Sequence, residues 1–219
     1  MLCKICQNNT ISFFSAALSK HYFYCPACEF ISINPSFIVN LEKEKAQYEN
    51  HHNSLENEGY VKMFEDFMDM FGEIFTCKEI DALDFGSGPT PVLGELLKRR
   101  GATVDCYDKF YQPQTIFKNK TYDLITSTEV FEHLENPLET LKMLVDCLKP
   151  NGIIAIMTLF HPNDTELFLQ WWYPRDPTHI SFFTCKTLKI LGEKCNLQML
   201  KEDGKRVVVF KRLFPSMFS

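Results

Sequence analysis

Apolar and polar positions between residues 80 and 157 fall into blocks that predict alternating strands and helices. Short apolar runs at 80–85, 102–107, 122–127 and 148–157 have the length of buried parallel strands. Between them, apolar residues return every three or four positions, as in helices that pack one face against a sheet. The pattern predicts a doubly wound, mostly parallel α/β sheet.

The flanking segments extend this prediction on both sides. Residues 41–75 form two helical patterns, of which the second is strongly amphipathic and should pack on the sheet. Residues 197–210 form two β-rich runs around an Asp-Gly turn, which indicates an antiparallel hairpin at the sheet edge. We therefore divide the chain into a cysteine-rich module at 1–35, a helical lid or linker at 36–78 and the α/β domain at 79–219.

A glycine-bearing turn, Asp84-Phe85-Gly86-Ser87-Gly88, follows the first of these strands. Gly86 and Gly88 allow a tight turn that lies close to a ligand, at the sheet edge where doubly wound folds bind nucleotides. Asp108 ends the second strand, 24 residues after Asp84, where an acid can bond ribose hydroxyls. The sequence predicts a nucleotide-type cofactor site here.

Helix boundaries and segment lengths refine the prediction. Thr90 as N-cap and Pro91 as first helical residue predict a helix directly after the turn, and Asn136 is predicted to cap a later one. Only 14 residues separate Asp108 from Asp123, too few for an additional helix and strand. We expect a shortened sheet edge there.

Two further stretches, Tyr-Asp-Leu-Ile-Thr-Ser-Thr-Glu-Val-Phe-Glu-His-Leu at 122–134 and Leu-Lys-Pro-Asn-Gly at 148–152, complete a family pattern. From about residue 83 to 158 the chain resembles the class I S-adenosylmethionine-dependent methyltransferases. The resemblance implies methyl transfer from S-adenosylmethionine to an acceptor, which we expect to be a small molecule. The residues that it implies at the cofactor are Asp84, Gly86, Ser87, Gly88, Asp108, Thr128 and Glu129, with Tyr48 and His52 from a lid; the alternative for His52 is a solvated loop histidine.

An aromatic, proline-rich loop at 171–183 carries the candidate catalytic residues. It resembles an Asp-Pro-Thr-His segment of some small bacterial methyltransferases, where that segment faces the active site. His179 is the predicted general base, because imidazole titrates near neutrality, and Asp176 is predicted to orient it. The alternative is an aromatic staple over the sheet edge. For His133 we favour a structural hydrogen bond over chemistry.

Four of the nine cysteines form two C-x-x-C pairs, Cys3 with Cys6 and Cys25 with Cys28, separated by 18 residues. This spacing is typical of a zinc ribbon, in which two turns present four thiolates in a tetrahedron. Four ordinary buried cysteines and a redox-active pair are the alternatives. The zinc is predicted to be structural, although a role in reading the substrate stays open.

Composition limits the function further. The 219-residue chain has 45% apolar residues and a net charge of −5, and its cysteine-rich module has few basic residues, so nucleic acid is a disfavoured partner. We expect a cytoplasmic protein with reduced thiols, because neither a signal sequence nor an apolar run of 18 residues occurs. Nothing in the pattern favours a particular oligomeric state.

Three other functions compete with small-molecule methyl transfer. An RNA methyltransferase would use the zinc ribbon to recognise its RNA substrate, but it would need a basic surface, which this sequence does not indicate. A zinc-containing binding module would have an inactive cofactor site, against which the intact glycine turn argues. A nicotinamide dehydrogenase would require a fuller G-x-G-x-x-G motif, which this turn does not offer; the glycine turn also departs from the methyltransferase pattern, whose third glycine is Thr90 here.

Overall fold

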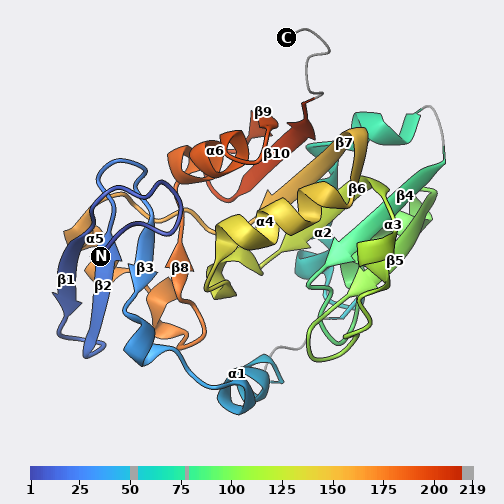
Figure 1. Ribbon diagram of the computed structural model, residues 1–219. Helices are drawn as coiled ribbons and strands as arrows, with labels where there is room; N and C mark the ends of the chain where they lie inside the picture. The colour runs from blue at the N-terminus through green and yellow to red at the C-terminus, as the bar shows by residue number, and fades with distance from the viewer. Residues whose placement is uncertain (50–53, 77–78, 214–219) are drawn as a thin grey trace, which may run out of the picture.

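The computed structural model describes residues 1–49, 54–76 and 79–213, and a six-stranded sheet forms its centre (Figure 1). The strand order is β5-β4-β6-β7-β10-β9, with β5, β4, β6 and β7 parallel and the last two antiparallel. The strands are β4 (Ile80–Phe85), β5 (Ala102–Tyr107), β6 (Tyr122–Thr128), β7 (Leu148–Met157), β9 (Leu197–Glu202) and β10 (Val207–Arg212). The predicted α/β fold and its antiparallel hairpin are confirmed.

Helices cover both faces of this sheet because successive strand residues point to opposite sides. Leu83 and Ile125 pack with α4 (Pro137–Asp146) and α6 (Cys185–Glu193) on one face. Ala82 and Leu124 pack with α2 (Glu58–Asp69) and α3 (Val92–Arg99) on the other. The remaining helices are α1 (Leu41–Tyr48) and α5 (Thr165–Gln170), with 3-10 turns η1 (Pro35–Phe37), η2 (Gly72–Thr76), η3 (Ile116–Asn119), η4 (Phe131–His133) and η5 (Tyr173–Arg175).

The sheet ends at β5, and the connection from β5 to β6 adds no further helix and strand to this edge, as expected. After β5 the chain forms a turn at Asp108 and the single 3-10 helix η3 before it enters β6. One predicted helix cap is wrong: Pro91, not Thr90, is the N-cap of α3, and Val92 N donates to the Thr90 carbonyl. Asn136 is the N-cap of α4, as predicted, but its side chain makes no cap bond. At α3 a backbone carbonyl thus replaces the expected side-chain acceptor.

A second, antiparallel sheet stands beside the first and has the order β1-β2-β3-β8 (Figure 1). Its strands are β1 (Ile11–Ser15), β2 (Lys20–Tyr24), β3 (Ile31–Ile33) and β8 (Ser181–Phe182). Ile31 pairs with Phe182, and a cluster of Tyr22, Ile33 and Phe168 fills the space around them. The cysteine-rich segment is therefore joined to the α/β half by backbone hydrogen bonds, while the division at residues 35 and 78 stays a prediction.

Within the described ranges, no helix is both long enough and apolar enough to cross a bilayer.

Candidate active site and metal centre

The turn after β4 has the conformation that its glycines predict. Gly86 has φ +86° and Gly88 φ +68°, in the left-handed region. The backbone N–H groups of Gly86 and Ser87 both donate to the Tyr107 carbonyl, at 2.7 and 3.0 Å. A Cβ atom on Gly86 would lie 2.1 Å from Val130 Cγ2, so this position requires glycine for space as well as for φ.

Asp108 holds two adjacent turns together. Its carboxylate accepts from the backbone N–H of Gly88 at 3.1 Å, of Phe110 at 2.8 Å and of Tyr111 at 3.1 Å. A carboxylate offers about four lone-pair sites, so roughly one remains for a ligand hydroxyl. The residue predicted to bind ribose therefore also shapes the glycine turn.

Asp84 lies beneath that turn as a fully buried acid. Burial raises the pKa of its carboxyl to about 7, although the Thr126 hydroxyl, 3.2 Å away, and the Gly94 N–H act in the opposite direction. The carboxyl is therefore partly protonated near neutral pH.

A cavity of about 500 Å³ opens at the carboxyl ends of β4, β5 and β6. The predicted site residues that line it are Asp84, Gly86, Ser87, Gly88, Asp108, Thr128, Glu129, Tyr48, Asp176 and His179. His52 lies outside the described residues. Tyr48 donates to Glu44 Oε1 at 3.0 Å, and its ring centroid lies 5.1 Å from that of His133. The structure thus brings both halves of the predicted site to one cavity.

Glu132 and Tyr173, which the sequence did not single out as site residues, meet beside the cavity next to the predicted Glu129. Tyr173 places its hydroxyl 2.5 Å from Glu132 Oε1 and 3.2 Å from Glu129 Oε2. Burial and the nearby Glu129 charge hold the pKa of Glu132 well above its usual range. Glu132 sits in the family-like stretch at 122–134, but its meeting with Tyr173 depends on a contact 41 residues apart.

Two histidines on the cavity wall are oriented by backbone carbonyls. His133 Nδ1 lies 3.0 Å from the Thr178 carbonyl, and His179 Nδ1 lies 2.9 Å from the Tyr173 carbonyl. Because a carbonyl only accepts, each Nδ1 carries a proton, and the lone pair of such a ring in its neutral form lies on Nε2. The structural hydrogen bond predicted for His133 is present, and burial lowers the pKa of this ring to about 3.

Asp176 is predicted to orient His179, but a backbone carbonyl is the hydrogen-bond partner of His179 Nδ1. Asp176 Oδ1 accepts from the backbone N–H and hydroxyl of Thr178, and its Oδ2 accepts from Gln47 at 3.1 Å. The Tyr173 carbonyl is the partner of the His179 Nδ1 atom. Asp176 therefore shapes the loop that carries His179 and adds a negative charge near the ring.

A family described as a methyltransferase domain matches residues 57–202, about two thirds of the chain. This chain belongs to the class I S-adenosylmethionine-dependent methyltransferases. The resemblance stated from the motifs is thereby confirmed.

Several methyltransferases of known name are similar to this one. It is 29% identical over 90 residues to the ubiquinone biosynthesis O-methyltransferase of Photobacterium profundum, covering 41% of this chain and 38% of that one. It is 35% identical over 91 residues to the malonyl-[acyl-carrier protein] O-methyltransferase of Halalkalibacterium halodurans, covering 41% and 30%. Both alignments span less than half of the relative.

Solved structures share the fold of this methyltransferase. The magnesium protoporphyrin IX methyltransferase of Synechocystis PCC 6803, with bound SAH, superposes with a TM-score of 0.50 at 13% identity over 78% of this chain and 94% of that one. The plantazolicin methyltransferase in complex with SAH gives 0.51 at 16% identity over 81% and 93%. At these identities the comparison establishes the fold alone.

The four predicted zinc ligands of this methyltransferase converge. The sulfur atoms of Cys3, Cys6, Cys25 and Cys28 lie within 4.8 Å of one another, with 3.5 Å between Cys3 and Cys28 and 3.3 Å between Cys6 and Cys25. Four thiolates around zinc lie roughly 3.8 Å apart, from a Zn–S distance of about 2.3 Å. The donor set and its spacing therefore fit a tetrahedral zinc site.

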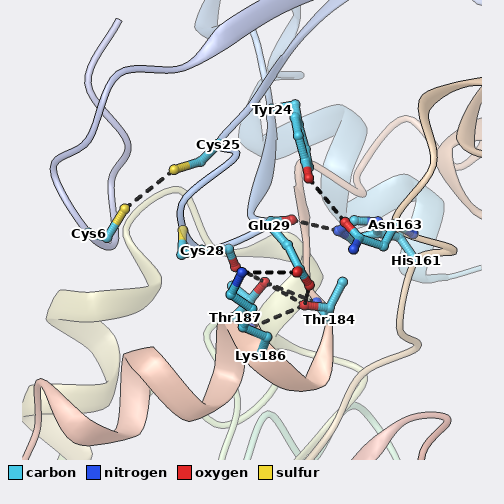
Figure 2. Close-up of polar contacts among 10 residues, drawn as sticks. All are labelled: Cys6, Tyr24, Cys25, Cys28, Glu29, His161, Asn163, Thr184, Lys186 and Thr187. Atoms are coloured by element: carbon cyan, nitrogen blue, oxygen red, sulfur yellow. Dashed lines mark hydrogen bonds and ion pairs between the residues drawn. The ribbon is translucent and has the colours of Figure 1, made fainter.

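Polar contacts connect this cysteine cluster to residues 161–187, a segment that includes His179 and is called the acceptor segment below (Figure 2). The Cys28 carbonyl accepts from the Thr187 hydroxyl at 2.8 Å. The Glu29 carboxylate accepts hydrogen bonds from the Thr184 hydroxyl and the Lys186 ammonium group, and the Glu29 carbonyl accepts one from His161 Nε2 at 2.7 Å. Both ends of the segment from 161 to 184 are thus attached beside the cluster.

Proposed function

We propose that this protein transfers a methyl group from S-adenosylmethionine to a hydroxyl group of a small acceptor. The observation that carries the proposal is a cavity of about 500 Å³ that is lined both by the glycine turn with Asp108 and by the histidine-bearing loop. A methyl transfer requires donor and acceptor in line, held away from water. Oxygen as the acceptor atom is supported by the names of the two relatives, both O-methyltransferases.

Transfer to oxygen also requires removal of a proton, and the histidine-bearing loop that lines the same cavity provides a group for it. A hydroxyl group must lose its proton as it attacks the methyl carbon, and His179 is the imidazole that we assign to promote that loss. Tyr173 and Tyr48 line the same cavity, and their rings contact those of His179 and His133, which limits the access of water to these histidines. Asp176 keeps the loop in place through Thr178.

We also propose that Cys3, Cys6, Cys25 and Cys28 hold one structural zinc ion. The support is the paired spacing in the sequence and the convergence of the four sulfur atoms. A segment too small for a core of its own gains folding free energy from such a site. Elemental analysis of the purified protein should give one zinc per chain, and a value near zero would contradict the assignment.

Two glycine variants test the cofactor site with a matched control. Gly86→Ala and Gly101→Ala both place a Cβ at positive φ, but at Gly101 nothing lies within 4 Å, whereas at Gly86 the Cβ meets Val130. Calorimetry should show one S-adenosylhomocysteine bound per chain in the wild type and in Gly101→Ala, and loss of binding in Gly86→Ala.

The reverse pattern, or no binding by the wild type, would refute the cofactor assignment. Transfer of labelled methyl groups to a panel of small hydroxyl compounds then tests the acceptor class. Transfer to amines alone would contradict the choice of oxygen.

A further inference from the structure

Glu132, His133 and His179 place three metal-ligand groups at one point of the cavity wall. Their candidate ligand atoms, one from each residue, all lie within 4.8 Å of one another. Glu132 and His133 share the 3-10 turn η4, and His179 comes from the loop after η5. Two imidazoles and one carboxylate form the donor set that binds first-row divalent cations with open coordination positions.

The groups around these three residues match the outer shell of a metal site. Ligating histidines almost always donate their other ring N–H to a carbonyl, carboxylate or water, which fixes the ring. His133 Nδ1 does so to Thr178, and His179 Nδ1 to Tyr173. The hydroxyl of the same Tyr173 lies 2.5 Å from Glu132 Oε1. One short segment, 173–179, therefore orients all three groups.

Glu132 supplies a second, independent observation. It is fully buried, and among the described residues its Oε2 atom has no hydrogen-bond partner. A buried carboxyl oxygen without a partner is costly, and a cation removes that cost. Glu129 and Asp176 add negative charge to the cavity, while Lys109 on its wall already pairs with Glu44 at 2.5 Å.

We propose that Glu132, His133 and His179 bind one divalent first-row transition-metal cation, separate from the cysteine cluster. This assignment deepens the proposed function and relies on it for its chemistry. The acceptor hydroxyl that coordinates such a cation becomes more acidic and releases its proton to water, so with the cation bound His179 promotes this loss as a ligand of the cation and does not take the proton itself. Its oxygen then bonds to the methyl carbon, the carbon–sulfur bond breaks, and the electron pair stays on sulfur to give S-adenosylhomocysteine.

Manganese(II) tests the site without knowledge of the acceptor. It favours oxygen and nitrogen ligands over thiolates, so the cysteine cluster does not compete for it. Electron paramagnetic resonance titration of protein that carries only one zinc per chain, held by the cysteines, should show one bound Mn²⁺ per chain. Electron spin echo modulation of that complex should show coupling to imidazole nitrogen. Absence of bound Mn²⁺, or a bound ion without nitrogen coupling, overturns the proposal even if no variant folds.

Variants locate the ion. Tyr173 contacts the proposed ligands rather than the ion, so Tyr173→Phe should weaken Mn²⁺ binding by roughly 10–100-fold. His133→Ala and His179→Ala each remove a ligand and should weaken it more than Tyr173→Phe does. His21→Ala, at an exposed histidine on β2, is the control and should bind like the wild type. Equal affinity in all four variants would refute the site.

Calorimetry with S-adenosylhomocysteine on the same samples separates the two proposals. Cofactor binding without Mn²⁺ binding removes the metal site alone. Mn²⁺ binding without cofactor binding removes the methyl-transfer proposal and leaves the metal site standing.

Discussion

Replacement of Asp108 by alanine should both weaken the cofactor site and destabilise the fold. The carboxylate binds the N–H groups of Gly88, Phe110 and Tyr111. Alanine leaves these three donors without their acceptor and removes the lone pair available to a ribose hydroxyl. The variant therefore tests whether one side chain serves the turn and the ligand together.

The magnitude follows from the contacts. A hydrogen bond to a charged group contributes about 1.5–3 kcal/mol, which sets an upper range of roughly 5–9 kcal/mol for three. Asp108 is only half buried, so water can replace part of what is lost. We expect a fall in the free energy of unfolding of about 2–4 kcal/mol, and a loss of cofactor binding free energy of about 1.5–3 kcal/mol.

Urea unfolding followed by circular dichroism measures the first quantity, and calorimetry with S-adenosylhomocysteine measures the second. Asp66→Ala is the control, because this exposed acid contacts Lys62 within its own helix, an interaction that contributes only a few tenths of a kcal/mol. If Asp108→Ala unfolds at the same urea concentration as Asp66→Ala, the three backbone bonds do not stabilise the fold and the reasoning fails.

Three further predictions concern pH, zinc and catalysis. Asp84 takes up a proton on folding between pH 3.8 and about 7, so its contribution to the free energy of unfolding is largest at low pH and is lost as the pH rises through about 7. In Asp84→Asn, urea unfolding at a series of pH values should show that this part of the pH dependence of stability is gone. Cys25→Ser should lose the zinc by elemental analysis and lower acceptor turnover more than cofactor affinity, because the cluster holds the acceptor segment rather than the glycine turn. His179→Asn should keep S-adenosylhomocysteine affinity in calorimetry and lower turnover by roughly 10²–10⁴; unchanged turnover with a lower melting temperature would indicate a purely structural residue.

The cofactor half of the site was predictable because its signals are local. Gly86 and Gly88 follow directly on a strand, and Asp108 ends the next one, so sequence spacing alone places them at the same sheet edge. The C-x-x-C pairs are local in the same sense. The wrong cap at Thr90 shows the limit of such signals, since a backbone carbonyl can replace a side-chain acceptor.

The acceptor half was predictable only in part, because it depends on distant contacts. The sequence indicates a functional loop around His179, but Glu132 gains its significance from Tyr173, and His133 from Thr178. These pairs form when η5 and the following loop dock beside η4. No periodicity or short motif encodes that docking.

The two-residue strand β8 makes the cysteine-rich module dependent on a distant part of the chain. Ile31 and Ser32 of β3 find their backbone partners in Phe182 and Ser181. A fragment of residues 1–35 would therefore expose the apolar edge of β3, and such edges pair with other copies and aggregate. Grafting this module onto another protein would require residues 181–187 as well, because they supply the backbone partners of β3 and the hydroxyl bound to the Cys28 carbonyl.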